Sequence, residues 1–108
     1  MTLLEQELNI LLSVDHPYIV KFYEAFLDHK YVHLVMEYCN GGDLSDKLIK
    51  IKRFSEIQTK KIIKQSLYAL KHLHEHNIAH RDFKPENILF TVDDNDIKLI
   101  DFGISKML

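Results

Sequence analysis

The sequence predicts an α+β fold in which a helix, a β-hairpin, two further helices and a second hairpin follow one another. Three observations support this prediction. Leucines recur at helical spacing over residues 4–12, and two runs at 18–26 and 31–38 are rich in β-branched and aromatic residues. A third pattern, again of helical period, follows a helix-start signal near residue 55.

Length and composition set the limits of the prediction. The chain has 108 residues, 46% of them hydrophobic and 28% charged, which is typical of one globular domain with a modest core. Its formal charge of −2 gives no reason to expect nucleic acid or a membrane surface as a partner. A single cysteine fits a reducing compartment, so we expect a cytoplasmic protein, with the nucleus as a second location.

The first half should contain a helix and a hairpin. The leucine pattern stops at Asp15-His16-Pro17, and a polar turn at 28–30 separates the two strand-like runs. Asn40-Gly41-Gly42 ends the second run, and Asp43 can cap a short helix that follows.

The second half should contain a long helix and a second hairpin. Ser55 and Gln58 form a capping-box pattern at the start of the helix. We expect its core face to be one apolar stripe, with Asn77 as a left-handed terminator; the stripe comprises Ile63, Leu67, Leu70 and His74. Short strands at 88–90 and 97–100 then flank an acidic turn at 93–96.

The chemistry concentrates in two motifs, HRDFKPEN at residues 80–87 and DFG at residues 101–103. Phosphoryl transfer from a nucleotide requires a carboxylate that orients the attacking hydroxyl and oxygen ligands that hold Mg²⁺ on the triphosphate. Asp82, Asn87 and Asp101 supply these groups, and Lys84 adds a positive charge beside the transferred phosphate.

The order and spacing of these motifs resemble the protein kinase superfamily. The resemblance implies part of a bilobal kinase fold: the end of the N-lobe sheet with its helix αC over residues 1–38, then the hinge and the first part of the helical C-lobe over residues 39–108. It also implies that Asp82 is the catalytic base, and that Asn87 and Asp101 bind Mg²⁺ beside ATP.

The resemblance extends to the nucleotide-binding hinge. Met36 matches the gatekeeper, and the backbone at Glu37 and Cys39 matches the main chain that binds adenine. Asp43 lies where the family contacts ribose, although its role as a helix cap explains it equally well. Leu89 would form the floor under the adenine ring.

The first helix matches αC of the family. Glu7 corresponds to the glutamate that pairs with a strand lysine and so helps to hold the nucleotide phosphates. Leu11, Phe22, His80 and Phe102 match the residues of a stack that links αC to the catalytic loop.

Within the superfamily, Lys84 two residues after Asp82 is typical of kinases that phosphorylate protein Ser/Thr hydroxyls. The catalytic loop most resembles the calcium/calmodulin- and calcium-dependent kinases, apart from Phe83 in place of their usual Leu. The hinge sequence at 36–44 also resembles NIMA-related kinases, which are the alternative.

Several family features are absent from these 108 residues, among them a glycine-rich phosphate loop and a strand lysine to pair with Glu7. We therefore expect a fragment that is inactive alone, with any regulatory domain lying outside it. Two other functions remain open. One is a non-catalytic binding module from a truncated kinase, and the other is a small-molecule phosphotransferase, whose loop typically lacks Lys84-Pro85-Glu86.

Overall fold

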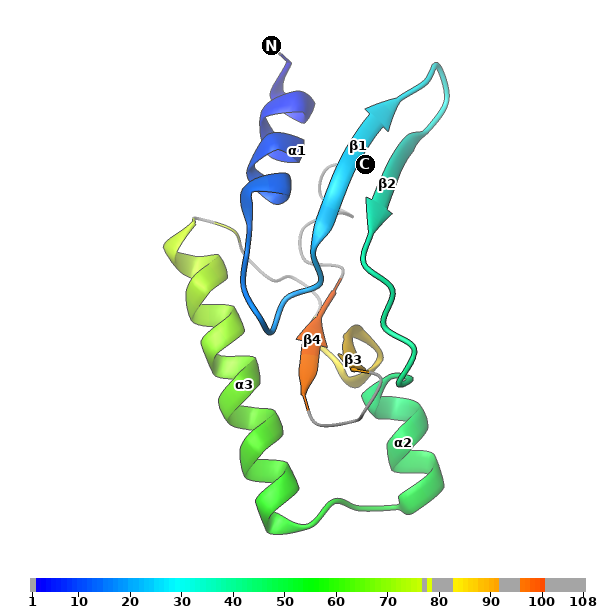
Figure 1. The fold of residues 1–108 in the computed structure, drawn as a ribbon, viewed down its shortest axis with the longest axis vertical. Helices are drawn as coiled ribbons and strands as arrows, with labels where there is room; N and C mark the ends of the chain where they lie inside the picture. The colour runs from blue at the N-terminus through cyan, green and yellow to red at the C-terminus, as the bar shows by residue number, and fades with distance from the viewer. Residues whose placement is uncertain (1, 77, 79–82, 92–95, 101–108) are drawn as a thin grey trace.

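The computed structural model of the chain describes residues 2–76, 78, 83–91 and 96–100 (Figure 1). Its elements are α1 (Leu3–Ser13), β1 (Phe22–Leu27), β2 (Val32–Met36), α2 (Leu44–Ile51), α3 (Glu56–Glu75), a 3-10 turn (Pro85–Asn87), β3 (Ile88–Phe90) and β4 (Ile97–Leu99). In one half of the molecule α1 lies beside the hairpin β1–β2, and in the other α2 and α3 lie on either side of β3–β4. The predicted α+β class and element order are confirmed.

Helix α1 begins and ends near the residues that the leucine pattern predicted. The hydroxyl of Thr2 caps it by accepting a hydrogen bond from the backbone N–H of Glu5 at 3.1 Å. The helix ends at Ser13, and Val14 is already extended. Leu8 and Leu11 are buried, so this side of the helix packs on the core.

The hairpin β1–β2 is antiparallel, with Phe22 opposite Met36 and Leu27 opposite Val32. Asp28 organises its turn, because one carboxylate oxygen accepts hydrogen bonds from the backbone N–H groups of both Lys30 and Tyr31 at 2.7 Å. Phe22 is buried in the core, while most of the hairpin beyond it is exposed.

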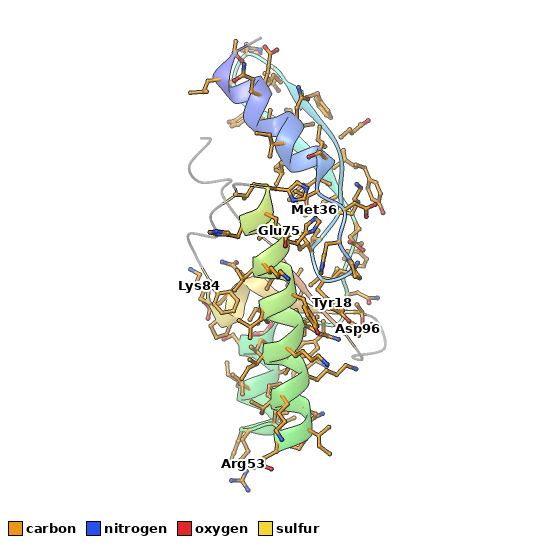
Figure 2. All side chains as sticks on the ribbon, turned by 90° about the vertical axis from the view of Figure 1, so that its left-hand side faces the viewer. Tyr18, Met36, Arg53, Glu75, Lys84 and Asp96 are labelled. Atoms are coloured by element: carbon orange, nitrogen blue, oxygen red, sulfur yellow. The ribbon has the colours of Figure 1, made fainter. Side chains whose placement is uncertain are left out.

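Helix α3 starts with the predicted capping box. The Ser55 hydroxyl accepts a hydrogen bond from the Gln58 backbone N–H at 3.1 Å, and the Gln58 side-chain oxygen accepts one from the Ser55 N–H at 3.2 Å. Figure 2 shows the length of the helix, with Arg53 just before its first turn and Glu75 at its end. The expected terminator Asn77 lies outside the described residues.

The predicted core face of α3 is wrong. Ile63 and Leu67 are 54% and 60% exposed and His74 is exposed, whereas Leu70 is half-buried. The buried face lies one residue earlier along the chain, and comprises Gln65, Ser66, Ala69 and Leu73. One residue corresponds to a rotation of about 100° around a helix. Apolar periodicity favours the first stripe, because the stripe that is buried contains the polar residues Gln65 and Ser66.

Strand β4 lies at the centre of the molecule because it is hydrogen-bonded on both sides. It pairs with β3, with Ile88 opposite Leu99. On the other side, Leu99 donates to the Tyr18 carbonyl at 2.9 Å and accepts from the Val20 N–H at 2.9 Å. The segment before β1 is thereby joined to the second hairpin.

The hydrophobic core surrounds this junction, and its buried residues come from α1, β1 and the segment before it, α3, β3 and β4. Its buried residues are Leu11, Val14, Ile19, Phe22, Ala69, Leu73, Ile88, Phe90, Ile97 and Leu99. Burying one large aliphatic side chain contributes roughly 1.5–3 kcal/mol, so this cluster fixes the position of β3 and β4. No helix in the described part of the chain is long and apolar enough to cross a membrane.

Candidate functional site

The expected functional residues that can be placed lie on three segments: the end of β2 with its connection to α2, the 3-10 turn with β3, and helix α1. Asp82, Arg81 and His80, together with Asp101 and Phe102, lie outside the described residues. The other expected residues can be placed.

The connection between β2 and α2, residues 37–43, runs beside β3. Gly41 donates a hydrogen bond to the Phe90 carbonyl at 3.2 Å, and the Phe90 N–H donates to the Gly42 carbonyl at 2.8 Å. Asp43 forms an antiparallel bridge with Leu89. These contacts hold the predicted hinge along β3, directly after the turn that contains Asn87.

The glycines at this contact are required for different reasons. A Cβ atom on Gly41 would lie 2.3 Å from the Thr91 carbonyl oxygen, which no side chain can tolerate. Gly42 has open space around it but a φ of +81°, a conformation that favours glycine. The glycine pair therefore lets the hinge approach β3 and then turn into α2.

Met36, the expected gatekeeper, is the last residue of β2, and Glu37 follows it. The Glu37 N–H donates to the Lys21 carbonyl at 2.8 Å. Within the described residues, the Glu37 carbonyl and the Cys39 N–H make no hydrogen bond to another backbone group. These two groups have the polarity that adenine requires, one acceptor and one donor.

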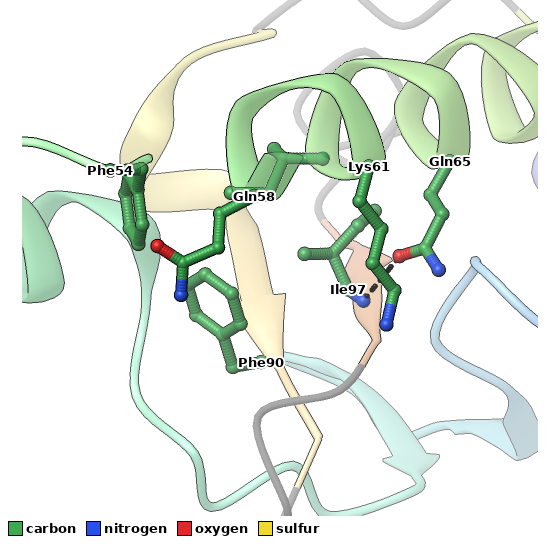
Figure 3. Close-up of a pocket in the computed structure, with 7 residues that line it drawn as sticks. Phe54, Gln58, Lys61, Gln65, Phe90 and Ile97 are labelled. Carbon is green, nitrogen blue, oxygen red and sulfur yellow. Dashed lines mark hydrogen bonds between the residues drawn. The ribbon is translucent and has the colours of Figure 1, made fainter. Parts of the chain in front are cut away.

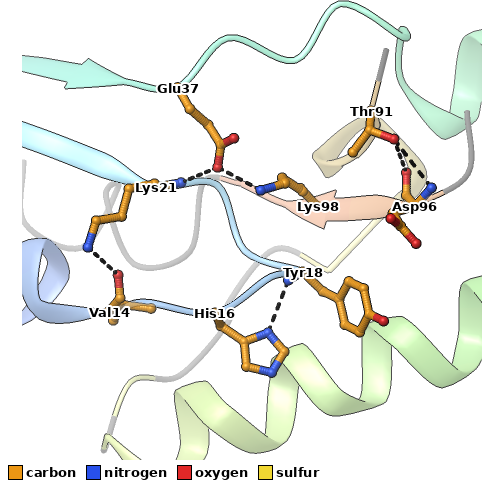
Figure 4. A network of polar contacts seen from close by, with 8 residues as sticks. All are labelled: Val14, His16, Tyr18, Lys21, Glu37, Thr91, Asp96 and Lys98. Carbon is orange, nitrogen blue, oxygen red and sulfur yellow. Dashed lines mark hydrogen bonds and ion pairs between the residues drawn. The ribbon is translucent and has the colours of Figure 1, made fainter. Parts of the chain in front are cut away.

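The Glu37 side chain is part of a polar network (Figure 4). One of its oxygens accepts a hydrogen bond from the Lys21 backbone N–H at 2.8 Å and from the Lys98 ammonium at 3.0 Å. The Lys21 ammonium in turn donates to the Val14 carbonyl at 3.3 Å. The network connects the hinge, the segment before β1, and β4.

Leu89 lies on the opposite face of β3 from its buried neighbours Ile88 and Phe90. Its partner across the hairpin is Lys98. Directly paired residues share one face of a sheet, so Leu89 and Lys98 lie on the side of β3–β4 where Lys98 meets Glu37. The role of Leu89 under an adenine ring stays a prediction.

Asp43 is the N-cap of α2, and its carboxylate accepts a hydrogen bond from the Asp46 N–H at 2.8 Å. The capping role that the sequence suggested is confirmed. Its contact with a ribose stays a prediction.

The 3-10 turn places two further site residues. Lys84 precedes the turn and is exposed, and its carbonyl accepts a hydrogen bond from the Asn87 N–H at 2.9 Å. Asn87 is buried, with 8% of its surface exposed, and its carbonyl accepts from the Ile100 N–H at 3.0 Å. The chain is thus held against Asn87 at the residue directly before Asp101.

Helix α1 carries Glu7, whose side chain lies outside the described part of the structure. The members of the expected stack that can be placed, Leu11 and Phe22, are 1% and 2% exposed and belong to the same core cluster. Its other two members lie outside the described residues.

Cys39 lies in the hinge and is half-buried. Burial raises the pKa of the Cys39 thiol, and the Glu37 carboxylate raises it further, although Lys98 acts in the opposite direction. A thiol with a raised pKa carries little thiolate at neutral pH, so Cys39 is not suited to be a nucleophile.

A cavity of about 40 Å³ lies between α3 and the β3–β4 hairpin, with Phe54 and Phe90 at one end and Lys61 and Gln65 at the other (Figure 3). None of the expected site residues that the structure describes lines it. A larger groove of about 290 Å³ is lined by α2, α3 and the 3-10 turn, and Lys84 is the only expected site residue described there.

Lys98 and its contact with Glu37 were missed by the sequence analysis. A signal was present, because Lys98 is a charged residue between the apolar Ile97 and Leu99, as expected for the solvent-facing position of a strand. No local pattern indicates that Glu37, 61 positions away, approaches Lys98.

Comparisons with known proteins agree with this arrangement. Residues 2–108 match the family described as protein kinase domain. Calcium-dependent protein kinase 5 of Plasmodium berghei (strain Anka) is 47% identical over 104 residues, covering 94% of this chain and 18% of that protein. A protein of Dictyostelium discoideum named probable myosin light chain kinase is 44% identical over 107 residues, covering 97% of this chain and 34% of that protein.

A solved structure is similar as well. The crystal structure of Rad53 1–466 in complex with AMP-PNP superimposes with a TM-score of 0.88 at 37% identity, covering 93% of this chain and 27% of that one. The chain therefore spans about a fifth to a third of these relatives. Because the family match extends over nearly all of its length, this chain belongs to the protein kinase domain family.

Proposed function

We propose that this chain forms the hinge and catalytic-loop portion of a protein kinase that transfers the γ-phosphoryl group of ATP to protein Ser/Thr hydroxyls. One observation supports this most directly. The hinge at 41–43 and the chain at Ile100 are both hydrogen-bonded to the single segment 87–90. An adenine held by the hinge and a triphosphate near Asn87 would then share one rigid support.

The nucleotide is proposed to lie over Leu89, with the Glu37 carbonyl and the Cys39 N–H at its adenine edge. Asn87 fits a metal ligand, because an amide oxygen is a hard donor and the residue is held in a buried turn. Asp101 would supply a carboxylate. Mg²⁺ bound there would neutralise charge on the phosphates during transfer.

Asp82 is proposed to accept the proton of the attacking hydroxyl, and Lys84 to place a positive charge near the transferred group. The short side chains of Ser and Thr suit a base and a lysine that are only two residues apart in the chain. The protein substrate and any regulatory domain lie beyond what this segment specifies.

The test places the full 108-residue chain in the P. berghei kinase, in place of the segment that it matches. We expect ATP-dependent phosphorylation of a peptide library on Ser and Thr. Asp82→Asn should lower kcat by orders of magnitude and leave ATP binding intact, whereas Asp101→Asn should also weaken Mg-ATP binding.

An active hybrid with normal turnover in Asp82→Asn would contradict the role of the base, and phosphotyrosine as the main product would contradict the substrate class. A folded but inactive hybrid that retains binding to the host's partners would favour the non-catalytic binding module.

A further inference from the structure

The ion pair between Lys98 and Glu37 has features that distinguish it from ordinary surface pairs. The nitrogen–oxygen distance is 3.0 Å, and the two side chains are only 19% and 20% exposed. Fully exposed pairs contribute little, because solvent screens them and both side chains lose freedom. This pair is partly buried, and the same Glu37 oxygen accepts a second hydrogen bond, from the Lys21 N–H at 2.8 Å. Together these contacts restrict the orientation of the Glu37 carboxylate.

The two donors to Glu37 are fixed relative to each other. Leu99 is hydrogen-bonded to Tyr18 and Val20, at 2.9 Å in each case, so β4 and the segment before β1 form one unit. Lys98 belongs to the first and Lys21 to the second. A carboxylate held by both has one position, and the Glu37 main chain is held with it.

Some polar groups of residues 37–39 are bonded within the protein, and others have no backbone partner in the described residues. The carboxylate and the Glu37 N–H are both used within the protein, toward Lys98 and Lys21. The Glu37 carbonyl and the Cys39 N–H are left without backbone partners in the described residues.

We propose that Lys98 is a positioning residue for ATP, which holds the Glu37 carboxylate and thereby sets the adenine-binding main chain of residues 37–39 against β4. The inference rests on the proposed kinase function and adds a residue that does not touch the nucleotide. Strand β4 ends at Leu99, and the N–H of the next residue, Ile100, donates a hydrogen bond to the Asn87 carbonyl at 3.0 Å. One short strand thus holds the adenine end of the site through Lys98 and leads directly to the metal end.

The experiment uses the same hybrid kinase, carrying the full 108-residue chain, with Ca²⁺ saturating because the host is named calcium-dependent. In Lys98→Met we expect KM for ATP and the Ki of adenosine to rise together by roughly tenfold, equivalent to about 1.4 kcal/mol. The Ki of inorganic tripolyphosphate with Mg²⁺, KM for the peptide, and kcat should change by less than about twofold. Lys98→Arg should restore KM for ATP, because a guanidinium also pairs with a carboxylate.

Two comparisons make the result specific. Glu37→Gln should give the same rise, and the double variant should show no further rise, because both substitutions break one contact. Lys71→Met, which removes an exposed lysine from α3, should leave every constant unchanged. In the 108-residue chain itself, Lys98→Met should speed hydrogen exchange at the Glu37 amide and Lys71→Met should not.

The outcomes separate this inference from the proposed function. An inactive hybrid that binds no adenosine refutes the kinase function itself. An active hybrid in which Lys98→Met leaves KM for ATP unchanged, or lowers kcat alone as a loss of folded enzyme would, refutes the positioning role. Additive effects of the Lys98 and Glu37 substitutions would refute it as well.

Discussion

At Gly41 the hinge passes so close to β3 that a side chain has no room. The Thr91 carbonyl would lie 2.3 Å from an added Cβ, and the Phe90 carbonyl oxygen 2.7 Å from it. Gly42, next in the chain, is surrounded by open space and is constrained only by its positive φ. The two neighbouring glycines therefore have separate physical causes, one of packing and one of backbone conformation.

Substitution by asparagine should separate these causes, because Asn tolerates the left-handed region but carries a Cβ. We expect Gly41→Asn to lower the free energy of unfolding by about 1–3 kcal/mol through overpacking. Gly42→Asn should cost less than about 1 kcal/mol. Urea titration of both variants measures the difference, and equal costs at the two positions would contradict the close approach to Thr91.

At the scale of elements, Gln65 links α3 to the start of β4. Its side-chain oxygen accepts a hydrogen bond from the Ile97 N–H at 3.0 Å, and its side-chain nitrogen donates to the Asp96 carboxylate at 2.8 Å (Figure 3 shows the first contact). Both the oxygen and the nitrogen of this buried side-chain amide are thus hydrogen-bonded. Gln65 replaces the strand partner that Ile97 would otherwise need.

Replacing Gln65 by leucine should leave the buried Ile97 N–H without its acceptor. We expect Gln65→Leu to lower the free energy of unfolding by about 1–3 kcal/mol, although leucine is more apolar. Thr59→Ala, an exposed substitution on the same helix, should stay within about 0.5 kcal/mol. Urea denaturation of the two variants provides the measurement. If Gln65→Leu is more stable than the original chain, the hydrogen bond to Ile97 makes no net contribution to stability.

The turn of the β1–β2 hairpin should respond to acid. Hydrogen bonds from His33, then from the Lys30 and Tyr31 N–H groups, lower the pKa of Asp28 from 3.8 to about 2. A lowered folded-state pKa means that ionised Asp28 stabilises the turn fully above about pH 4, and that this contribution is lost as the pH falls from 3.8 toward 2.

An NMR titration of the Lys30 and Tyr31 amides should therefore show a midpoint near the lower value. Asp28→Asn should abolish the transition and leave a less ordered turn at neutral pH. If the amide signals instead titrate with a midpoint near pH 3.8, the ordinary carboxyl pKa, the hydrogen bonds to Asp28 would be contradicted.

At the scale of the whole molecule, the core accounts for only part of the apolar surface. Large hydrophobic residues remain exposed on the β1–β2 hairpin, among them Tyr23 at 63% and Phe26 at 51%. Others, such as Ile63 and Leu67, line the groove of about 290 Å³ beside α2 and the 3-10 turn. Exposed apolar surface of this kind, gathered in the groove and on the hairpin, favours association.

We expect the 108-residue chain to bind a dye that reports apolar surface and to self-associate as its concentration rises. Introducing lysine at Ile63 and Leu67 together should lower dye fluorescence, because both residues line the groove. Ile57→Lys is the matched control, since Ile57 is 81% exposed on the same helix but does not line the groove. Dye titration and sedimentation velocity measure both effects; a strictly monomeric chain without dye binding would contradict the expectation.

The sequence by itself determined the elements and the family. Caps such as Ser55 with Gln58 and the alternation around Lys98 depend on neighbours within a few residues, so they can be predicted locally. The glycine pair before Asp43 predicts the end of a strand, but the lack of room for a side chain at Gly41 is caused by Thr91, which is distant in the sequence. The motifs at 80–87 and 101–103 identified the protein kinase family through their order, and the match over residues 2–108 confirmed it. The boundary between lobes at residue 38 and the roles of Asp82 and Asp101 stay predictions.

Tertiary structure alone decided which face of α3 is buried and what holds the hinge. Two stripes of α3 are apolar enough to face a core, and only the position of β4 selects the one with Gln65, Ala69 and Leu73. Likewise, Glu37 and Lys98 are 61 residues apart, and they meet because β4 pairs with residues 18–20. Both outcomes depend on the pairing of segments that are distant in the sequence. A local pattern of apolar and polar residues does not show which distant segments pair.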